Sequence, residues 1–222
     1  MLKPITALLL FAAAACAQEA RPVQCRFLSF AVVDSLSSVI TLSNQGADIE
    51  CPLSSTELSP QITCFAKGNA IAFLNAGTRE PVVAATIPPN VKSALLIFIG
   101  GGQTPNDPAQ TKTKVLVIED SPKNFPDGGA YIANFHQSPI RFVVGEHKGM
   151  LKPGGSHGYA LPKQRDSFNM APVIFEFLKG DSWHIANESA LRFLPGVRYL
   201  IFAYVDPQSG RPRINTCQDI VR

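Results

Sequence analysis

The stretch Pro89-Asn90-Val91-Lys92-Ser93-Ala94-Leu95-Leu96-Ile97-Phe98 decides how the fold is interpreted, because a version of it recurs downstream as Pro195-Gly196-Val197-Arg198-Tyr199-Leu200-Ile201-Phe202-Ala203-Tyr204. In each copy a proline turn and a basic residue precede a short apolar run rich in β-forming side chains. A run of this kind, bounded by turn residues, is typical of a buried β-strand. The copies lie about 100 residues apart, which is the length of a typical β-sandwich domain.

Three further pairs of segments match in the same order and at nearly the same separation. They are Phe27, Ser29 and Phe30 with Ile132, Asn134 and Phe135; Phe73-Leu74 with Phe177-Leu178; and Lys114-Val115 and Glu119-Asp120 with Arg213-Ile214 and Gln218-Asp219. Matches at a near-constant period indicate an internal repeat, although two unrelated β-domains can also share hairpin patterns. The common order favours two copies of one β-unit.

Short apolar segments of strand length alternate with turn residues along the whole chain. The predicted strands are residues 26–30, 93–99, 114–118, 131–135, 140–144, 173–178 and 198–205. No window of a dozen residues has the helical period, and residues 188–194 allow a helical turn or two at most. The pattern predicts an all-β fold of two tandem, duplicated β-sandwich domains, immunoglobulin-like or similar, after a signal peptide.

The predicted domains are residues 18–121 and 127–222. The segment between them contains Pro122 and Pro126, which cannot donate a backbone hydrogen bond and therefore interrupt strand pairing. The second domain holds all 4 histidines and the 1 tryptophan. If one of the two domains carries a ligand site, the second is favoured.

Residues 1–17 have the features of a secretory signal peptide. Lys3 supplies a positive charge, residues 5–15 are apolar, and Ala15-Cys16-Ala17 is a small-residue cleavage site. The apolar run is shorter than the roughly 20 residues that cross a bilayer, so no transmembrane segment is expected in the mature chain. We expect an exported protein, periplasmic or extracellular. Lipid anchoring at Cys16 is the minor alternative, because Ala13 stands where a lipobox usually has leucine.

The charge balance bears on the class of partner. The 20 basic and 17 acidic residues give a net charge of +3, and the basic residues form no run. Nucleic-acid-binding proteins carry a basic patch or stripe, so no nucleic-acid partner is predicted. The expected partner is an unknown envelope protein or a glycan.

Removal of the signal peptide leaves Cys25, Cys51, Cys64 and Cys217. An even number of cysteines in an exported chain is consistent with disulfides, and four cysteines allow three pairings. The short polar segment between Cys51 and Cys64 favours a bond between these two. Cys25 would then pair with Cys217 and tie the first strand to the last. A metal site is the alternative, but the sequence has no C-x-x-C motif to support it.

Four segments, residues 88–98, 114–121, 125–131 and 210–220, resemble a group of exported bacterial proteins without assigned function, and the resemblance covers residues 64–222. Residues 131–139 have a looser similarity to β-sandwich lipoprotein domains, from which this chain departs by lacking a clear lipobox. The resemblance implies location and fold. It supplies no catalytic motif.

The sequence lacks the motifs that usually mark a catalytic or metal site. It has neither a G-x-S-x-G elbow nor an H-E-x-x-H pair, and no helix is predicted after Gly100-Gly101-Gly102, as a phosphate loop requires. His136, His147 and His157 are weak candidates for a metal site, because three imidazoles could meet on one rim. No cofactor is predicted.

Three residues are candidates for contact with a partner. Residues 148–162 are rich in proline and glycine and are predicted to form a long loop, which includes Tyr159 and precedes Arg165. Trp183 follows a predicted turn and is the third candidate.

These observations favour a non-catalytic exported protein that binds or scaffolds a component of the bacterial cell envelope. One alternative is an envelope hydrolase in which the histidines, or two of the carboxylates Asp166, Glu176 and Asp181, converge in the second domain. The other alternative is a metal-binding module. An enzyme is therefore the less favoured class.

Overall fold

The computed structural model describes residues 20–30, 36–100, 113–206 and 209–220. Within these ranges the chain forms sixteen β-strands and no helix, which confirms the predicted all-β class. Among the described residues there is accordingly no helix with the length and hydrophobicity of a membrane span. The predicted signal peptide and Cys16 lie outside the described residues.

The first eight strands form two four-stranded sheets, which we call the N-terminal unit. The strand orders are β4-β1-β7-β8 and β3-β2-β5-β6. Strand pairs are antiparallel except β1 and β7, which run parallel from Gln24↔Ser93 to Phe30↔Ile99. The strands are β1 (Arg21–Phe30), β2 (Ser38–Leu42), β3 (Asp48–Pro52), β4 (Ile62–Ala66), β5 (Ala70–Asn75), β6 (Pro81–Thr86), β7 (Ser93–Ile99) and β8 (Lys114–Glu119).

The last eight strands form the C-terminal unit. Its sheets have the orders β12-β9-β15-β16 and β11-β10-β13-β14, and its one parallel pair joins β9 to β15. The strands are β9 (Ala130–Asn134), β10 (Ile140–Val144), β11 (His147–Leu151), β12 (Ser156–Tyr159), β13 (Met170–Lys179), β14 (Ser182–Arg192), β15 (Val197–Val205) and β16 (Pro212–Ile220).

The topology of the first unit recurs strand by strand in the second. Each strand order of the C-terminal unit is that of the N-terminal unit with every strand number raised by eight, and the parallel pair occupies the equivalent place. The sequence matches lie on or directly beside equivalent strands, namely β1 and β9, β5 and β13, β7 and β15, and β8 and β16.

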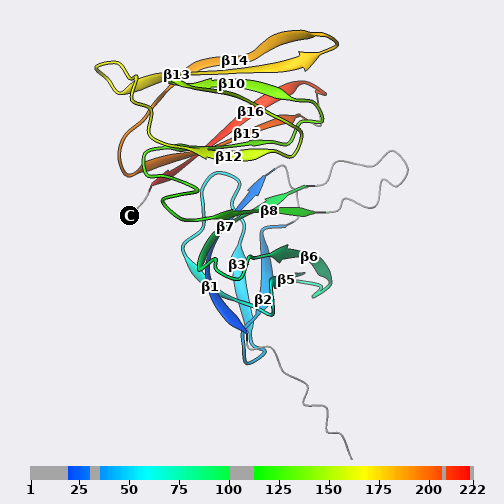
Figure 1. The fold of residues 1–222 in the computed structure, drawn as a ribbon. Coiled ribbons are helices and arrows are strands. Elements are labelled where there is room, and N and C mark those ends of the chain that lie inside the picture. The colour runs from blue at the N-terminus through cyan, green and yellow to red at the C-terminus, as the bar shows by residue number, and fades with distance from the viewer. Residues whose placement is uncertain (1–19, 31–35, 101–112, 207–208, 221–222) are drawn as a thin grey trace, which may run out of the picture.

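The four sheets stack as layers with an apolar core in each of the three spaces between them (Figure 1). The N-terminal core lies between the two sheets of the N-terminal unit and includes Phe27, Phe73 and Phe98. The C-terminal core lies between the two sheets of the C-terminal unit and includes Phe142 and Phe175. The middle core lies between the two units.

The middle core explains why the stretch from Pro89 to Phe98 ends in an uninterrupted apolar run. Side chains alternate between the faces of a strand, so Leu96 and Phe98 of β7 enter the N-terminal core while Leu95 and Ile97 enter the middle core. Strand β15 divides in the same way, with Phe202 in the middle core. A strand that is buried on both faces has an apolar run instead of an apolar–polar alternation.

Aromatic rings from both units meet in the middle core. The ring centroid of Phe30 lies 5.0 Å from that of Phe202 and 4.9 Å from that of Tyr204. Phe135 stacks on Phe202 at 5.4 Å. Aromatic pairs of this kind contribute about 0.5–1.5 kcal/mol beyond the burial of their area. These aromatic pairs therefore stabilise the contact between the units beyond the contribution of buried apolar area.

The segment that links the units is packed against the C-terminal unit. Phe125 is fully buried in the middle core. The backbone oxygen of Asn124 approaches Gly158 so closely that a Cβ at position 158 would lie 1.9 Å from it. Only glycine permits this approach of two backbones.

One prediction about secondary structure is wrong, and one segment for which the sequence allowed at most a helical turn or two is a strand. Residues 148–162, predicted as a long loop, contain most of β11 and all of β12, joined by a turn in which Gly154 has a φ of 72°. Residues 188–192, within the segment where a helical turn was allowed, belong to β14, which pairs with β13 along its whole length. Strands β11 and β14 form hairpins with the preceding strands β10 and β13, whereas β12 pairs with β9, which lies more than twenty residues earlier. Their polar and glycine-containing sequences have little strand propensity of their own, so pairing and tertiary context decide the conformation.

The Phe202→Ala variant tests the middle core. We expect a loss of about 3–5 kcal/mol in the free energy of unfolding, because the fully buried ring would leave a cavity. Urea denaturation followed by far-UV circular dichroism measures this loss.

Val205, at the end of the same strand and 39% exposed, provides the control. Val205→Ala should stay within about 0.5 kcal/mol of the unchanged chain. Equal effects of the two substitutions would contradict the role given to the middle core.

Candidate functional site

Arg26, Asp120, Arg198 and Asp219 form a charged network where the two units meet. Arg198 donates from Nε to Oδ2 of Asp219 at 3.0 Å and from Nη1 to Oδ1 of Asp120 at 2.8 Å. Nη1 of Arg26 lies 2.8 Å from Oδ1 of Asp219. Arg26 and Asp120 belong to the N-terminal unit and the other two to the C-terminal unit, so these ion pairs join the units.

The guanidinium of Arg198 is buried but well compensated. Its Cζ lies 4.1 Å from the ring centroid of Phe125, and Nη1 also donates to the carbonyl oxygen of Phe125 at 3.1 Å. Burial opposes the positive charge, but the bonds to Asp120 and Asp219 outweigh burial and raise the pKa of Arg198. The group therefore stays charged, as a buried ion that is paired with carboxylates can.

A cleft of about 770 Å³ opens beside this network. Its lining includes all four charged residues together with Phe125. Each guanidinium group in the network bonds to a carboxylate, so the two positive charges and the two negative charges compensate one another. These ion pairs join the two units. The four network residues therefore add no uncompensated charge to the lining of the cleft.

None of the four network residues is among the predicted site residues. The repeat nevertheless contains a sequence signal for the network. The matched segments of the repeat align Lys92 with Arg198 and Asp120 with Asp219. Charged residues at matching positions beside buried strands indicate a shared structural role. Only the structure shows that Arg198 bonds to the aspartates of both copies.

The three histidines proposed as metal ligands do not meet at one point. His147 and His157 flank the ring of Tyr159, with centroids 5.5 and 5.0 Å away. His136 instead packs on Phe177, at 5.0 Å, and its Nδ1 accepts the backbone N–H of residue 138 at 2.8 Å. Across the described part of the chain, no three His, Cys, Asp or Glu side chains are grouped as a metal site.

Glu146 and His147 hold the segment that follows β12. The Glu146 carboxylate accepts the backbone N–H of Lys163 at 2.8 Å and that of Gln164 at 3.2 Å. Nε2 of His147 lies 2.9 Å from the carbonyl oxygen of Ala160. Partial burial opposes ionisation of Glu146, but the backbone N–H groups of Lys163, Glu146 itself and Gln164, together with nearby His147, outweigh it and lower the pKa of the carboxyl group.

Two of the three candidate contact residues have structural roles. Tyr159 packs its ring on Phe142, at 5.1 Å, beside the C-terminal core. Arg165 donates from Nη1 to the carbonyl oxygen of Phe193 at 2.7 Å. Both side chains are therefore used to hold residues 159–165 against the unit.

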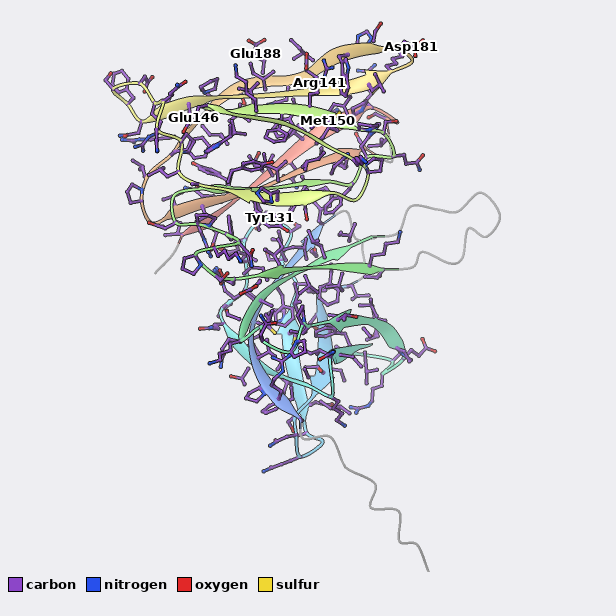
Figure 2. All side chains as sticks on the ribbon, viewed as in Figure 1. Tyr131, Arg141, Glu146, Met150, Asp181 and Glu188 are labelled. Carbon is purple, nitrogen blue, oxygen red and sulfur yellow. The ribbon has the colours of Figure 1, made fainter. Side chains whose placement is uncertain are left out.

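The acidic residues considered for hydrolysis lie on different parts of the C-terminal unit. Asp166 accepts the backbone N–H groups of Phe168 and Met170, each at 2.8 Å, and so stabilises a turn. Glu176 lies on β13, and Asp181 lies in the turn between β13 and β14 (Figure 2). The Asp166 carboxylate is therefore engaged in hydrogen bonds within its own turn. This turn precedes β13, whereas Asp181 follows β13.

One face of the β11-β10-β13-β14 sheet packs on the C-terminal core and the other forms the outer layer of the stack (Figure 1). We call the second face the outer face. A row of direct neighbours crosses its four strands: Met150, Arg141, Glu176 and Ile185. Met150 is 55% exposed and Ile185 59% exposed. Figure 2 shows Arg141, Met150 and Glu188 on this outermost sheet.

Trp183, the third candidate contact residue, lies beside this row. Cζ of Arg141 stands 4.1 Å from the centroid of the Trp183 ring, a cation–π contact. Leu178 is the direct cross-strand neighbour of Trp183. The outer face therefore combines an aromatic ring, exposed apolar side chains and charges of both signs.

The structure does not form the predicted disulfides. Cys25, Cys51, Cys64 and Cys217 are buried free thiols. Cys51 and Cys64 share the N-terminal core, as their predicted pairing requires. Cys25 also lies in the N-terminal core, whereas Cys217 lies in the middle core, where its Sγ contacts the carbonyl oxygen of Thr56 at 3.4 Å. The sheet that contains β1 therefore separates Cys25 from Cys217.

No protein-family model matches this sequence, and no curated protein sequence matches it.

The Arg198→Met variant tests the charged network. We expect a loss of about 3–5 kcal/mol in the free energy of unfolding, because the fully buried side chain of Asp219 would lose a strongly bonded partner. Urea denaturation measures it.

Arg79→Met is the matched control, since Arg79 pairs with Asp48 at the surface, where the two side chains are 55% and 41% exposed. Arg79→Met should lower the free energy of unfolding by about 0–1 kcal/mol. A small effect of Arg198→Met would show that the network is not needed for stability.

Glu146 should contribute to the acid sensitivity of the protein. Because its pKa is lower in the folded chain than in the unfolded chain, its contribution is present at neutral pH and is lost as the pH falls through the folded pKa. Glu146→Gln should therefore be less stable than the unchanged chain near pH 7, and the difference should disappear in acid.

Urea denaturation of both proteins between pH 7 and pH 3 measures this difference. A difference that stayed constant over that range would show that ionisation of Glu146 is not responsible.

Proposed function

We propose that the two units are tandem, duplicated β-sandwich domains with boundaries near residues 121 and 127. The repeated strand order and the two-sheet enclosure of each core support this proposal. Immunoglobulin constant domains place strands 1, 2, 5 and 4 in one sheet and 3, 6 and 7 in the other. The orders 4-1-7-8 and 3-2-5-6 depart from that arrangement, so we assign a similar fold of different strand order.

We further propose that the protein is exported and has a non-catalytic binding or scaffolding role in the bacterial cell envelope. The outer face carries this proposal. Trp and Arg are the side chains most enriched at the centres of binding surfaces, and here Arg141 and Trp183 lie in contact on a sheet face with exposed apolar neighbours. Large exposed apolar patches mark interaction sites, and the exposed side chains of Met150 and Ile185 lie on this same face.

The bonding of the other candidate residues supports a non-catalytic role. His136, His147 and Arg165 each engage a backbone group of the same unit. Arg198 is held by two carboxylates. These groups therefore stabilise turns and the junction between units, whereas the side chains of the outer face remain open to a partner, which we propose is an envelope protein or a glycan.

Trp183 gives the proposal a direct readout, because it is the 1 tryptophan of the chain. Titration with isolated peptidoglycan, and separately with envelope protein extract, should change its fluorescence in one of the two series. Arg141→Ala should weaken that binding about tenfold or more, because it removes a side chain in contact with the aromatic ring.

Ile220→Ala is the control, since Ile220 is 61% exposed but lies on β16, outside the outer face. Binding that leaves Trp183 fluorescence unchanged and does not respond to Arg141→Ala would exclude the outer face. Turnover of an envelope polymer by the purified chain would favour the hydrolase alternative.

A further inference from the structure

Strand β14 is the longest edge strand in the described part of the chain. It has 11 residues, lies at the end of its sheet, and contains neither proline nor lysine. Long edges present unpaired backbone groups to other chains, and proteins protect them with short strands, proline, lysine or β-bulges. The equivalent edge strand of the N-terminal unit, β6, is shorter, begins at Pro81 and has no charged residue. In β14 a bulge at Ala186 leaves residues 187–192 as a regular segment.

A hydrogen bond at the end of β14 shows which of its backbone groups point to the free edge. The N–H of Phe193 donates to the carbonyl oxygen of Asn169 at 2.9 Å, so the backbone groups of Phe193 point to the β13 side. Successive residues of an antiparallel strand alternate between the two sides. The backbone groups of Arg192, Ala190 and Glu188 therefore point away from β13.

A second hydrogen bond supports this assignment. Ala190 is the direct cross-strand neighbour of Pro172, which has no N–H. The carbonyl oxygen of Pro172 accepts the N–H of Gly145 at 2.9 Å and so points to the side of β10. Pro172 therefore offers no backbone bond to Ala190. Glu188, Ala190 and Arg192 are all exposed, so their edge-directed groups are open to another strand.

Glu188 and Arg192 place opposite charges on either side of Ala190. Both side chains lie on the outer face (Glu188 is labelled in Figure 2), where their cross-strand neighbours on β13 are Ile174 and Met170. Four residues of strand span about 13 Å, so the two charges are too far apart to pair within one strand. Among the described residues, neither side chain takes part in an ion pair.

We propose that β14 pairs with β14 of a second copy of this chain, in an antiparallel register centred on Ala190. In this register Glu188 faces the partner's Arg192, and Arg192 faces the partner's Glu188. Opposite charges directly across a strand pair stabilise it. The edge-directed N–H and C=O groups of Glu188, Ala190 and Arg192 meet those of the partner strand, so each facing pair exchanges both of its backbone hydrogen bonds.

No other two-fold register of the regular segment joins these charges. A centre at residue 188 would set two glutamate carboxylates opposite each other, and a centre at residue 189 or 191 would set a charge opposite Ala190. A centre between two residues would pair side chains of the outer face with side chains of the core face. Charge complementarity therefore selects a second copy of this chain as the partner of this edge.

The pairing would join the two outer sheets into one continuous sheet. Its two-fold axis is perpendicular to the sheet, so the outer faces of both copies lie on the same side. The carbonyl oxygen of Arg192 already accepts the Tyr199 hydroxyl at 2.8 Å and keeps a second lone pair for the partner strand. The contact is confined to one edge, so we expect weak, concentration-dependent association. This inference does not rest on the proposed binding role of the outer face.

Sedimentation velocity of the purified chain, from micromolar to millimolar concentration, tests the pairing. The unchanged chain should pass from monomer to dimer. Glu188→Arg and Arg192→Glu should each weaken the association about tenfold or more, because each sets like charges opposite each other. Glu50→Arg is the matched control, since it makes the same change of charge at an exposed position of the edge strand β3, and it should leave the association unchanged.

An equimolar mixture of the Glu188→Arg chain and the Arg192→Glu chain is the sharpest test. One chain then has only positive charges at the two positions and the other only negative charges. They should form a mixed dimer about as tight as that of the unchanged chain, although neither pairs with itself. The chain with both substitutions should also recover self-association, because its charges are exchanged. A merely structural role of the two residues would give neither recovery.

Ala190→Pro tests the backbone part of the contact. Proline removes an N–H that points away from β13, so the fold should tolerate it at this edge, whereas dimerisation should be lost. Circular dichroism checks that this variant is folded. The proposal would be overturned by an unchanged chain that stays monomeric at millimolar concentration, by association that does not respond to Glu188→Arg, or by a mixture that does not associate. Open-ended oligomers would also overturn it, because a two-fold contact closes at the dimer.

Discussion

In the middle core, apolar side chains of the two units are buried against each other. Strands β7 and β15 carry apolar side chains on both faces, so the sheets that contain them must be covered on both sides. Each unit covers one face of its own sheet and leaves the other face apolar. The units bury these remaining faces against each other, and the hydrophobic effect therefore turns two similar units into one stack of four sheets.

The charged network completes this contact at its edge. Arg198 bonds to Asp120 of one unit and Asp219 of the other, which occupy matching positions in the repeat. A buried ion pair is weak evidence for stability, but loss of one member leaves an uncompensated charge. The network therefore restricts how the units can be placed, since a shifted arrangement would bury these charges without partners.

The two units differ in the side chains that they expose and bury. The C-terminal unit presents the face on which Arg141 and Trp183 meet, and this face is remote from the contact between units because the C-terminal core lies between them. The N-terminal unit holds Cys25, Cys51 and Cys64 in its own core.

Alternation, apolar runs and turn residues are local signals, and they were enough to predict the all-β class, most central strands and the matching segments. The sequence did not show β11 and β12 as strands, because their own patterns are weak and they are defined by pairing with β10 and β9. It also placed Cys25 with Cys217, whereas the alternation of β1 directs Cys25 into a different core. Which face of each strand meets which layer depends on how whole sheets stack, so this became clear only from the three-dimensional arrangement.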